Sequence, residues 1–137
     1  MFRKVVETCI YSSDLHKMKN FYINNIGLQL VSEEDGRHVF LKAGKSMLLI
    51  FNPDSTSNKT QTTFPPHGAL TPPASVHFAL EIEKENYEDA KNMLIRNKID
   101  IEKEVSWGNA ETNSIYFRDP AFNLVEFITR GNWPVED

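Results

Sequence analysis

The chain has 137 residues, of which 40% are hydrophobic and 25% are charged, and this is the composition of one globular domain rather than a disordered chain. Its formal net charge of −4 argues against a dedicated nucleic-acid-binding protein, which usually carries a basic excess. The one cysteine, Cys9, excludes an intrachain disulfide, and no apolar run has the length of a signal peptide or a membrane span. We therefore expect a cytoplasmic protein with no membrane or nucleic-acid partner.

The first half of the chain predicts the element order βαβββ. Residues 5–11 are rich in β-branched and apolar side chains, which is typical of a strand. Capping residues at 12–14 then precede apolar residues at three- and four-residue spacing, which predict a helix that ends at Gly27. Three strands follow at residues 28–33, 38–42 and 47–51. Asp35-Gly36 lies between the first two of these strands and predicts a hairpin.

The second half of the chain predicts the same order after a linker. Residues 53–74 hold five of the seven prolines and many Ser and Thr residues, so we expect a linker across the surface. Beyond it we predict a strand at 76–82, a helix with an apolar face from Tyr87 to Leu94, and strands at 101–107, 114–118 and 124–129. The predicted division is a first module at 1–52, the linker at 53–74 and a second module at 75–137, within one compact domain overall.

The two halves also align residue by residue. Glu7 aligns with His77, the pair Leu41-Lys42 with Phe117-Arg118, and Ile50 with Glu126. This period is longer than that of the usual solenoid repeats, so it indicates a pseudo-symmetric pair of modules rather than an array.

Several motifs accompany this duplication. They are Ser13-Asp14-Leu15 and Phe21-Tyr22 in the first half, and the strand 76–81 and the closing segment 119–127 (Asp-Pro-x-x-Asn-Leu-x-Glu-Phe) in the second. With tandem βαβββ modules, this set resembles the vicinal oxygen chelate superfamily, which contains glyoxalase I, fosfomycin-resistance transferases, extradiol dioxygenases, epimerases and bleomycin-resistance proteins. The resemblance implies an α+β fold in which the two modules form a cupped mixed sheet around a central cavity, with the helices outside.

The resemblance also implies a set of metal ligands on the opening and closing strands of both modules. Mapped onto this chain, the four positions are Glu7, Ile50, His77 and Glu126. Because Ile50 cannot bind a metal, the chain departs from glyoxalase I, and three ligands remain, an arrangement closer to the fosfomycin enzymes and dioxygenases. Two carboxylates and one imidazole suit Mn²⁺, Fe²⁺, Ni²⁺ or Zn²⁺, with open positions where the ion can act as a Lewis acid. Glu126 is also the candidate catalytic residue, as a carrier of a proton.

Strand alternation supports this set, because it places Glu7, His77 and Glu126 on the faces that the resemblance assigns to the cavity. The candidate substrate-binding residues are His38, Phe40, Lys42, Ile50, Trp107, Tyr116 and Arg118. They describe a mostly apolar pocket with two cations, fitted to a small organic acid or phosphonate. Phe122 stands where the family's closing turn has Gly, so we expect a changed turn with Asn123 in the left-handed conformation.

These expectations combine into a divalent-metal-dependent isomerase or lyase of the glyoxalase family, acting on a small oxygen-rich or carboxylate metabolite. Two alternatives stay open: a metal-free protein that sequesters a ligand, as bleomycin-resistance proteins do, and a thiol transferase like the fosfomycin-resistance enzymes. We also expect a homodimer, because dimers are the commonest oligomers and superfamily members with two modules are often dimeric.

Overall fold

The computed structural model describes residues 1, 4–57, 67–68, 76–108 and 111–135. It divides the chain into two compact units, Met1–Ser75 and Val76–Asp137, which are described separately below. Among the described residues, no helix has both the length and the apolar character needed to cross a membrane.

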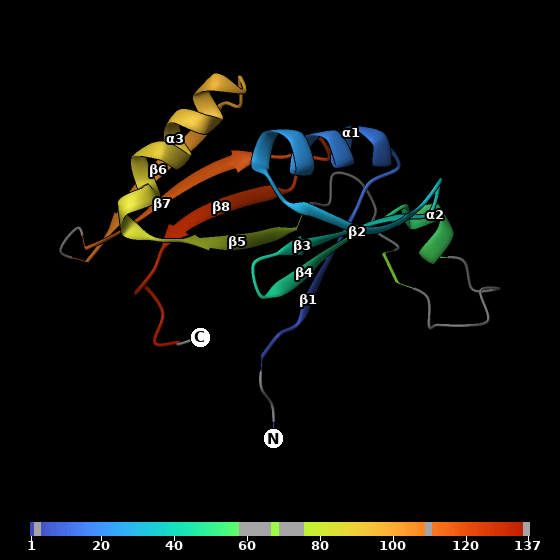
Figure 1. The fold of residues 1–137 in the computed structure, drawn as a ribbon, viewed down its shortest axis with the longest axis horizontal. Coiled ribbons are helices and arrows are strands. Elements are labelled where there is room, and N and C mark those ends of the chain that lie inside the picture. Colours follow the sequence, from blue (N-terminus) through green and yellow to red (C-terminus); the bar gives the residue numbers. More distant parts are fainter. Residues whose placement is uncertain (2–3, 58–66, 69–75, 109–110, 136–137) are drawn as a thin grey trace. The chain divides into compact units, whose positions relative to one another are not determined.

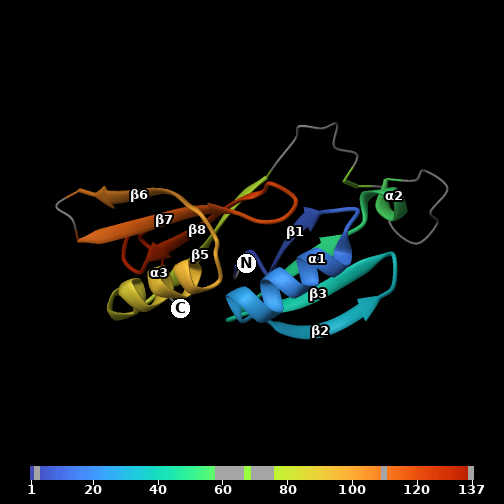
Figure 2. The same cartoon turned by 90° about the horizontal axis from the view of Figure 1, so that it is seen from above.

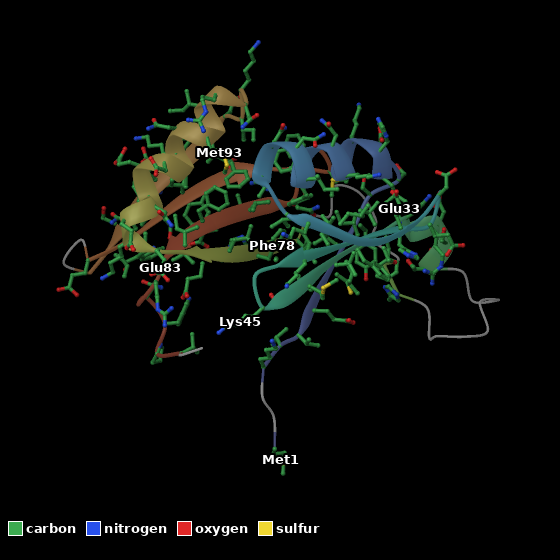
Figure 3. The ribbon with its side chains drawn as sticks, in the orientation of Figure 1. Met1, Glu33, Lys45, Phe78, Glu83 and Met93 are labelled. Carbon is green, nitrogen blue, oxygen red and sulfur yellow. The ribbon has the colours of Figure 1, made fainter. Side chains whose placement is uncertain are left out.

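The first unit contains a four-stranded mixed sheet. Its strands are β1 (Glu7–Tyr11), β2 (Gln29–Glu34), β3 (His38–Ala43) and β4 (Ser46–Phe51). The spatial order is β1-β4-β3-β2, with β1 parallel to β4 and the other pairs antiparallel. In Figure 3, Lys45 at the β3–β4 turn and Glu33 near the end of β2 mark opposite ends of this sheet. The predicted strands are confirmed to within two residues at each end.

The helix of the first unit lies against the sheet. It consists of α1 (Leu15–Asn20) and a π-helical continuation, η1 (Phe21–Ile26). Asp14 caps its start by accepting a hydrogen bond from the backbone N of Lys17, and Gly27 ends it at φ 93°, a conformation that glycine adopts without steric cost. Figure 2 shows α1 across the sheet, where it contacts β3 and β4.

The start of the predicted linker is helical. Residues Pro53–Thr56 form the short helix α2, which Asn52 caps by accepting a hydrogen bond from the backbone N of Asp54 at 3.0 Å. Proline at the first helical turn has no N–H that needs a partner, so it begins this helix without cost. Of the rest of the predicted linker, only residues 57 and 67–68 lie within the described part of the chain.

The second unit repeats the first. Its elements are β5 (His77–Ile82), η2 (Lys84–Asn86), α3 (Tyr87–Arg96), β6 (Ile101–Trp107), β7 (Thr112–Arg118) and β8 (Leu124–Thr129). The strand order is β5-β8-β7-β6, again with the first pair parallel. Figure 1 shows α3 along one face of the sheet, and Figure 3 shows Met93 on the side of α3 that faces it. Leu94 is fully buried. The predicted βαβββ order is thus confirmed in both halves.

The strand register corrects one position of the residue alignment. Glu7 pairs with Met47 as His77 pairs with Leu124, so Leu49 in β4, not Ile50, corresponds to Glu126 in β8. Ile50 lies on the opposite face of the sheet from Glu7 and is fully buried. The error has a simple cause, because a slip of one residue in a strand exchanges its two faces. Leucine, like isoleucine, cannot bind a metal, so the three-ligand interpretation is unchanged.

The turn between β7 and β8 also differs from the expectation. Phe122, and not Asn123, adopts the left-handed conformation, at φ 68°. Asn123 is held by its neighbours: its backbone N and side-chain amide both donate to the Asp119 carboxylate, and its side-chain oxygen accepts from the backbone N of Val76. Because these bonds fix Asn123, the reversal of the chain falls on the residue before it. The Phe122 side chain is 72% exposed, and the Arg118 guanidinium lies 5.9 Å from the centroid of its ring.

Candidate metal site

Two of the predicted ligands meet in the second unit. Parallel pairing of β5 and β8 sets His77 opposite Leu124 and Ala79 opposite Glu126, so the His77 and Glu126 side chains emerge on the same face. Nε2 of His77 lies 3.2 Å from Oε2 of Glu126. Glu126 is 5% exposed, whereas the His77 side chain is 48% exposed and gives the pair its open side.

The other ring nitrogen of His77 determines its tautomer. Nδ1 lies 2.9 Å from the backbone oxygen of Leu124, which can only accept, so Nδ1 carries a proton and donates it. In neutral His77 the lone pair is therefore on Nε2 and faces the Glu126 carboxylate. Two acceptors at this distance need either a proton or a metal ion between them.

The second oxygen of Glu126 already has a partner. Oγ of Ser114, on the neighbouring strand β7, donates to Oε1 at 2.5 Å, and Nε1 of Trp107 donates to Ser114 Oγ at 2.8 Å. Ser114 is fully buried. Glu126 therefore offers only Oε2 to the open side of the site.

Tyr116 lies beside the pair. It is directly opposite Glu126 in the β7–β8 register, and its ring centroid is 6.1 Å from that of His77. Burial raises the pKa of the Tyr116 hydroxyl, and the negative charge of Glu126 raises it further. Tyr116 thus stays a neutral hydrogen-bonding group next to the carboxylate.

The pair fits a divalent metal ion. A tetrahedral or octahedral ion with bonds of about 2.1 Å holds neighbouring ligand atoms about 3.0–3.4 Å apart, a range that includes the observed 3.2 Å. Histidine ligands also typically donate their second N–H to a carbonyl or carboxylate, as His77 does to Leu124. Within the described parts of each unit, no group of three or more His, Cys, Asp or Glu side chains could hold a metal ion. The second unit by itself therefore supplies two ligands.

Glu7, the third predicted ligand, lies in the first unit. It begins β1 with an exposed side chain, and its register position in the sheet is equivalent to that of His77. Cys9 follows on the same face, where burial and then the negative charge of Glu7 raise the pKa of its thiol. Cys9 is therefore a protonated thiol rather than a nucleophile.

Two candidate substrate-binding residues of the first unit, His38 and Phe40, belong to an aromatic cluster. The rings of His38 and Phe40 stack with centroids 3.9 Å apart, and Phe51 packs edge-on against Phe40 at 5.3 Å. Burial lowers the pKa of His38, the Arg37 guanidinium lowers it further, and Glu34 partly opposes them. Lys42 is exposed on β3.

The candidates of the second unit divide between two environments. Tyr116 and Trp107 connect to Glu126, as described above. Arg118 instead pairs with Glu102, with Nε 3.1 Å from Oε2, and donates to the backbone oxygen of Phe122 at 3.1 Å. Its guanidinium group is thus held at the β7–β8 turn.

Two contacts have no signal in the sequence. Ser114 is an ordinary strand serine, and only the β7–β8 pairing shows that it reaches Glu126. His67, which the sequence places in the linker, forms a 2.6 Å hydrogen bond between its Nδ1 and the Tyr11 hydroxyl. Gly68 follows at φ 80°, and a Cβ there would lie 2.3 Å from the Tyr11 ring, so no other residue fits.

Two βαβββ modules, each with a four-stranded mixed sheet, define the fold of the vicinal oxygen chelate proteins. The family model of the Glyoxalase/Bleomycin resistance protein/Dioxygenase superfamily matches residues 4–127, and the chain belongs to this superfamily. Members of the superfamily often depend on a metal ion.

Solved structures agree with this assignment. The crystal structure of lactoylglutathione lyase from Agrobacterium tumefaciens is similar, with 32% identity and a TM-score of 0.88 over 96% of this chain and 97% of that one. A glyoxalase/bleomycin resistance protein/dioxygenase from Nocardioides shares the fold at 18% identity and a TM-score of 0.73, over 100% of this chain and 91% of that one. A search of curated protein sequences gives no match.

Proposed function

We propose that this chain is a divalent-metal-dependent lyase or isomerase that acts on a small oxygen-rich or carboxylate metabolite. The observation that carries the proposal is the His77–Glu126 pair, in which an imidazole nitrogen of defined tautomer faces a buried carboxylate oxygen at 3.2 Å. Superfamily membership and the similarity to a lactoylglutathione lyase support the reaction class.

In this proposal His77, Glu126 and Glu7 hold the ion. The first two come from adjacent strands of one unit, and the equivalent register positions of Glu7 and His77 support Glu7 as the third. When bound, the ion would supply Lewis-acid polarisation of substrate oxygens. One imidazole and two carboxylates suit Mn²⁺, Fe²⁺, Ni²⁺ or Zn²⁺.

Glu126 also carries the proton transfer in this proposal. Its Oε2 faces the open side of the pair, while Ser114 occupies Oε1, so the same oxygen would either bind the ion or, when released from it, accept a proton from a carbon next to a substrate carbonyl. Tyr116, a neutral hydroxyl beside the pair, would orient a substrate oxygen by hydrogen bonding.

The relative's name suggests one compound to test first. Lactoylglutathione is a thioester with a hydroxyl group next to its carbonyl, so it presents two neighbouring oxygens to an ion. We include 2-hydroxy acids and phosphonates in the same panel, because Lys42, the candidate cation that is exposed on β3, favours an anionic ligand.

The test is metal binding by equilibrium dialysis of protein purified without chelator, with Mn²⁺, Fe²⁺, Ni²⁺ and Zn²⁺ in turn. We expect one ion per chain. His77→Gln, Glu126→Gln and Glu7→Gln should each weaken metal binding by more than the roughly 10–100-fold that is typical for loss of a residue hydrogen-bonded to a ligand. Glu81→Gln is the matched control, because Glu81 is an exposed carboxylate on the same face of β5 as His77. Failure of all four ions to bind stoichiometrically would overturn the proposal.

A metal-free ligand-binding protein is the second candidate. The aromatic cluster of His38, Phe40 and Phe51 favours it, because Phe40, its partly exposed ring, could stack on a planar organic group without a metal. A thermal-shift screen separates the two proposals: organic ligands that raise Tm in the presence of chelator support this one, and stabilisation by metals alone supports the enzyme.

We further propose that the protein is a homodimer. The edge strands β1 and β2 of one sheet and β5 and β6 of the other each present an unpaired backbone edge within their own sheet, and such edges favour association. Light scattering at tens of micromolar should give twice the 15.8 kDa chain mass. A monomer mass would refute this.

A further inference from the structure

The hydrogen bonds behind Glu126 connect Trp107, Ser114 and Glu126 in series. Trp107 Nε1 can only donate and an ionised carboxylate can only accept. The Ser114 hydroxyl accepts from Trp107 at 2.8 Å, so its single proton is available to donate to Glu126 Oε1, 2.5 Å away. Three residues on three adjacent strands, β6, β7 and β8, are thus connected in one order.

We propose that Ser114 and Trp107 are positioning residues for Glu126, which fix its rotamer and make it a one-oxygen ligand. Only the part of this inference that concerns metal binding rests on the proposed function. Because Ser114 holds Oε1, binding an ion through both oxygens would require the carboxylate to turn against this hydrogen bond, and Oε2 stays directed at His77.

Burial protects the Ser114–Glu126 hydrogen bond from water. Ser114 is fully buried and Glu126 is 5% exposed, so water cannot easily replace the serine hydroxyl. A buried carboxylate that loses a hydrogen bond loses a substantial part of its stabilisation, since hydrogen bonds to charged groups are stronger than neutral ones. Trp107 contributes through Ser114, because its N–H excludes the orientation in which the hydroxyl proton points at the indole.

Trp107 is also a spectroscopic reporter of this chain. The sequence has two tryptophans, Trp107 and Trp133, so the indole N–H signal of Trp107 can be assigned with a Trp133→Phe variant. A change in the charge of Glu126 should alter the hydrogen bond that the Trp107 N–H donates to the Ser114 hydroxyl, and so shift the resonance of that N–H.

The first experiment needs no metal. In the metal-free protein, Glu126→Gln should shift the indole ¹H–¹⁵N resonance of Trp107, and the same substitution in a Ser114→Ala background should leave that resonance unmoved. Ser106→Ala is the matched control, because Ser106 donates to Asn113 across the same strand pair and is not part of the chain to Glu126. An equal shift with and without Ser114 would overturn the proposal.

The second experiment measures metal affinity by dialysis. Ser114→Ala should weaken binding about 10–100-fold, as loss of a group that holds a ligand does, and Trp107→Phe should weaken it less because it acts through Ser114. Ser114→Thr, which keeps a hydroxyl, should restore affinity, and Ser106→Ala should leave it unchanged. Unaltered affinity in folded Ser114→Ala would overturn the positioning role.

The two experiments separate this inference from the proposed function. If no ion binds the unsubstituted protein but the indole shift depends on Ser114, the positioning chain holds and the metal-dependent function fails. If ions bind and the indole shift does not depend on Ser114, the metal site holds and the positioning chain fails.

Discussion

Replacing Asp119 by alanine should destabilise the protein strongly, because this carboxylate organises the turn that leads into the Glu126 strand. Asp119 is 4% exposed, and its oxygens accept from the backbone N of Ala121 at 2.8 Å, from the backbone N of Asn123 at 3.0 Å and from the Asn123 amide at 2.8 Å. The two Asn123 donors are buried, and leaving each unsatisfied costs about 1–3 kcal/mol. Relief of the left-handed conformation at Phe122 returns about 1 kcal/mol.

We therefore expect Asp119→Ala to lower the free energy of unfolding by about 3 kcal/mol, a large part of the roughly 5–15 kcal/mol of a typical domain. Urea denaturation followed by circular dichroism measures this change. Asp119→Asn keeps one acceptor oxygen for the backbone N–H groups of Ala121 and Asn123, so it should lower the free energy of unfolding by about half as much. Asp100→Ala, at an exposed position before β6, is the control and should change little. A loss below about 1 kcal/mol for Asp119→Ala would show that water replaces the carboxylate and would refute this reasoning.

Two further substitutions test the core and the pH dependence of stability. Leu94→Ala should lower the free energy of unfolding by about 3 kcal/mol because Leu94 is fully buried. Ile95→Ala, at a neighbour that is 57% exposed, should change it by less than about 0.5 kcal/mol. Equal losses in urea denaturation would contradict the placement of α3. The pKa of His38 is lowered in the folded protein, so between that pKa and the ordinary value of about 6.5 the unfolded chain binds more protons than the folded protein. The contribution of neutral His38 to the free energy of unfolding is therefore complete above pH 6.5 and is lost as the pH falls through the folded pKa. His38→Gln should therefore narrow the difference in stability between pH 8 and pH 5.5, and exposed His16→Gln should not; an unchanged difference in His38→Gln would show that other groups dominate.

The sequence by itself determined the order of the elements and the faces of most strands. Apolar residues at period 2 and at period 3.6, together with signals such as Asp35-Gly36 and Gly27, depend only on local geometry, so they predict both βαβββ modules. The closing motif around Glu126 then indicated the superfamily. The alignment failed by one residue at Ile50, because an apolar β4 strand shows no alternation that would fix its register.

The tertiary structure decided which side chains meet. Two residues far apart in the sequence, His77 and Glu126, come to 3.2 Å because β5 and β8 pair in parallel, and nothing local to either strand specifies that pairing. The role of Ser114 and the left-handed conformation of Phe122 likewise depend on partners in other segments. Hydrogen bonds and contacts between distant segments are absent from any local pattern, and for this reason the sequence could suggest the ligands but not the chain of bonds that holds them.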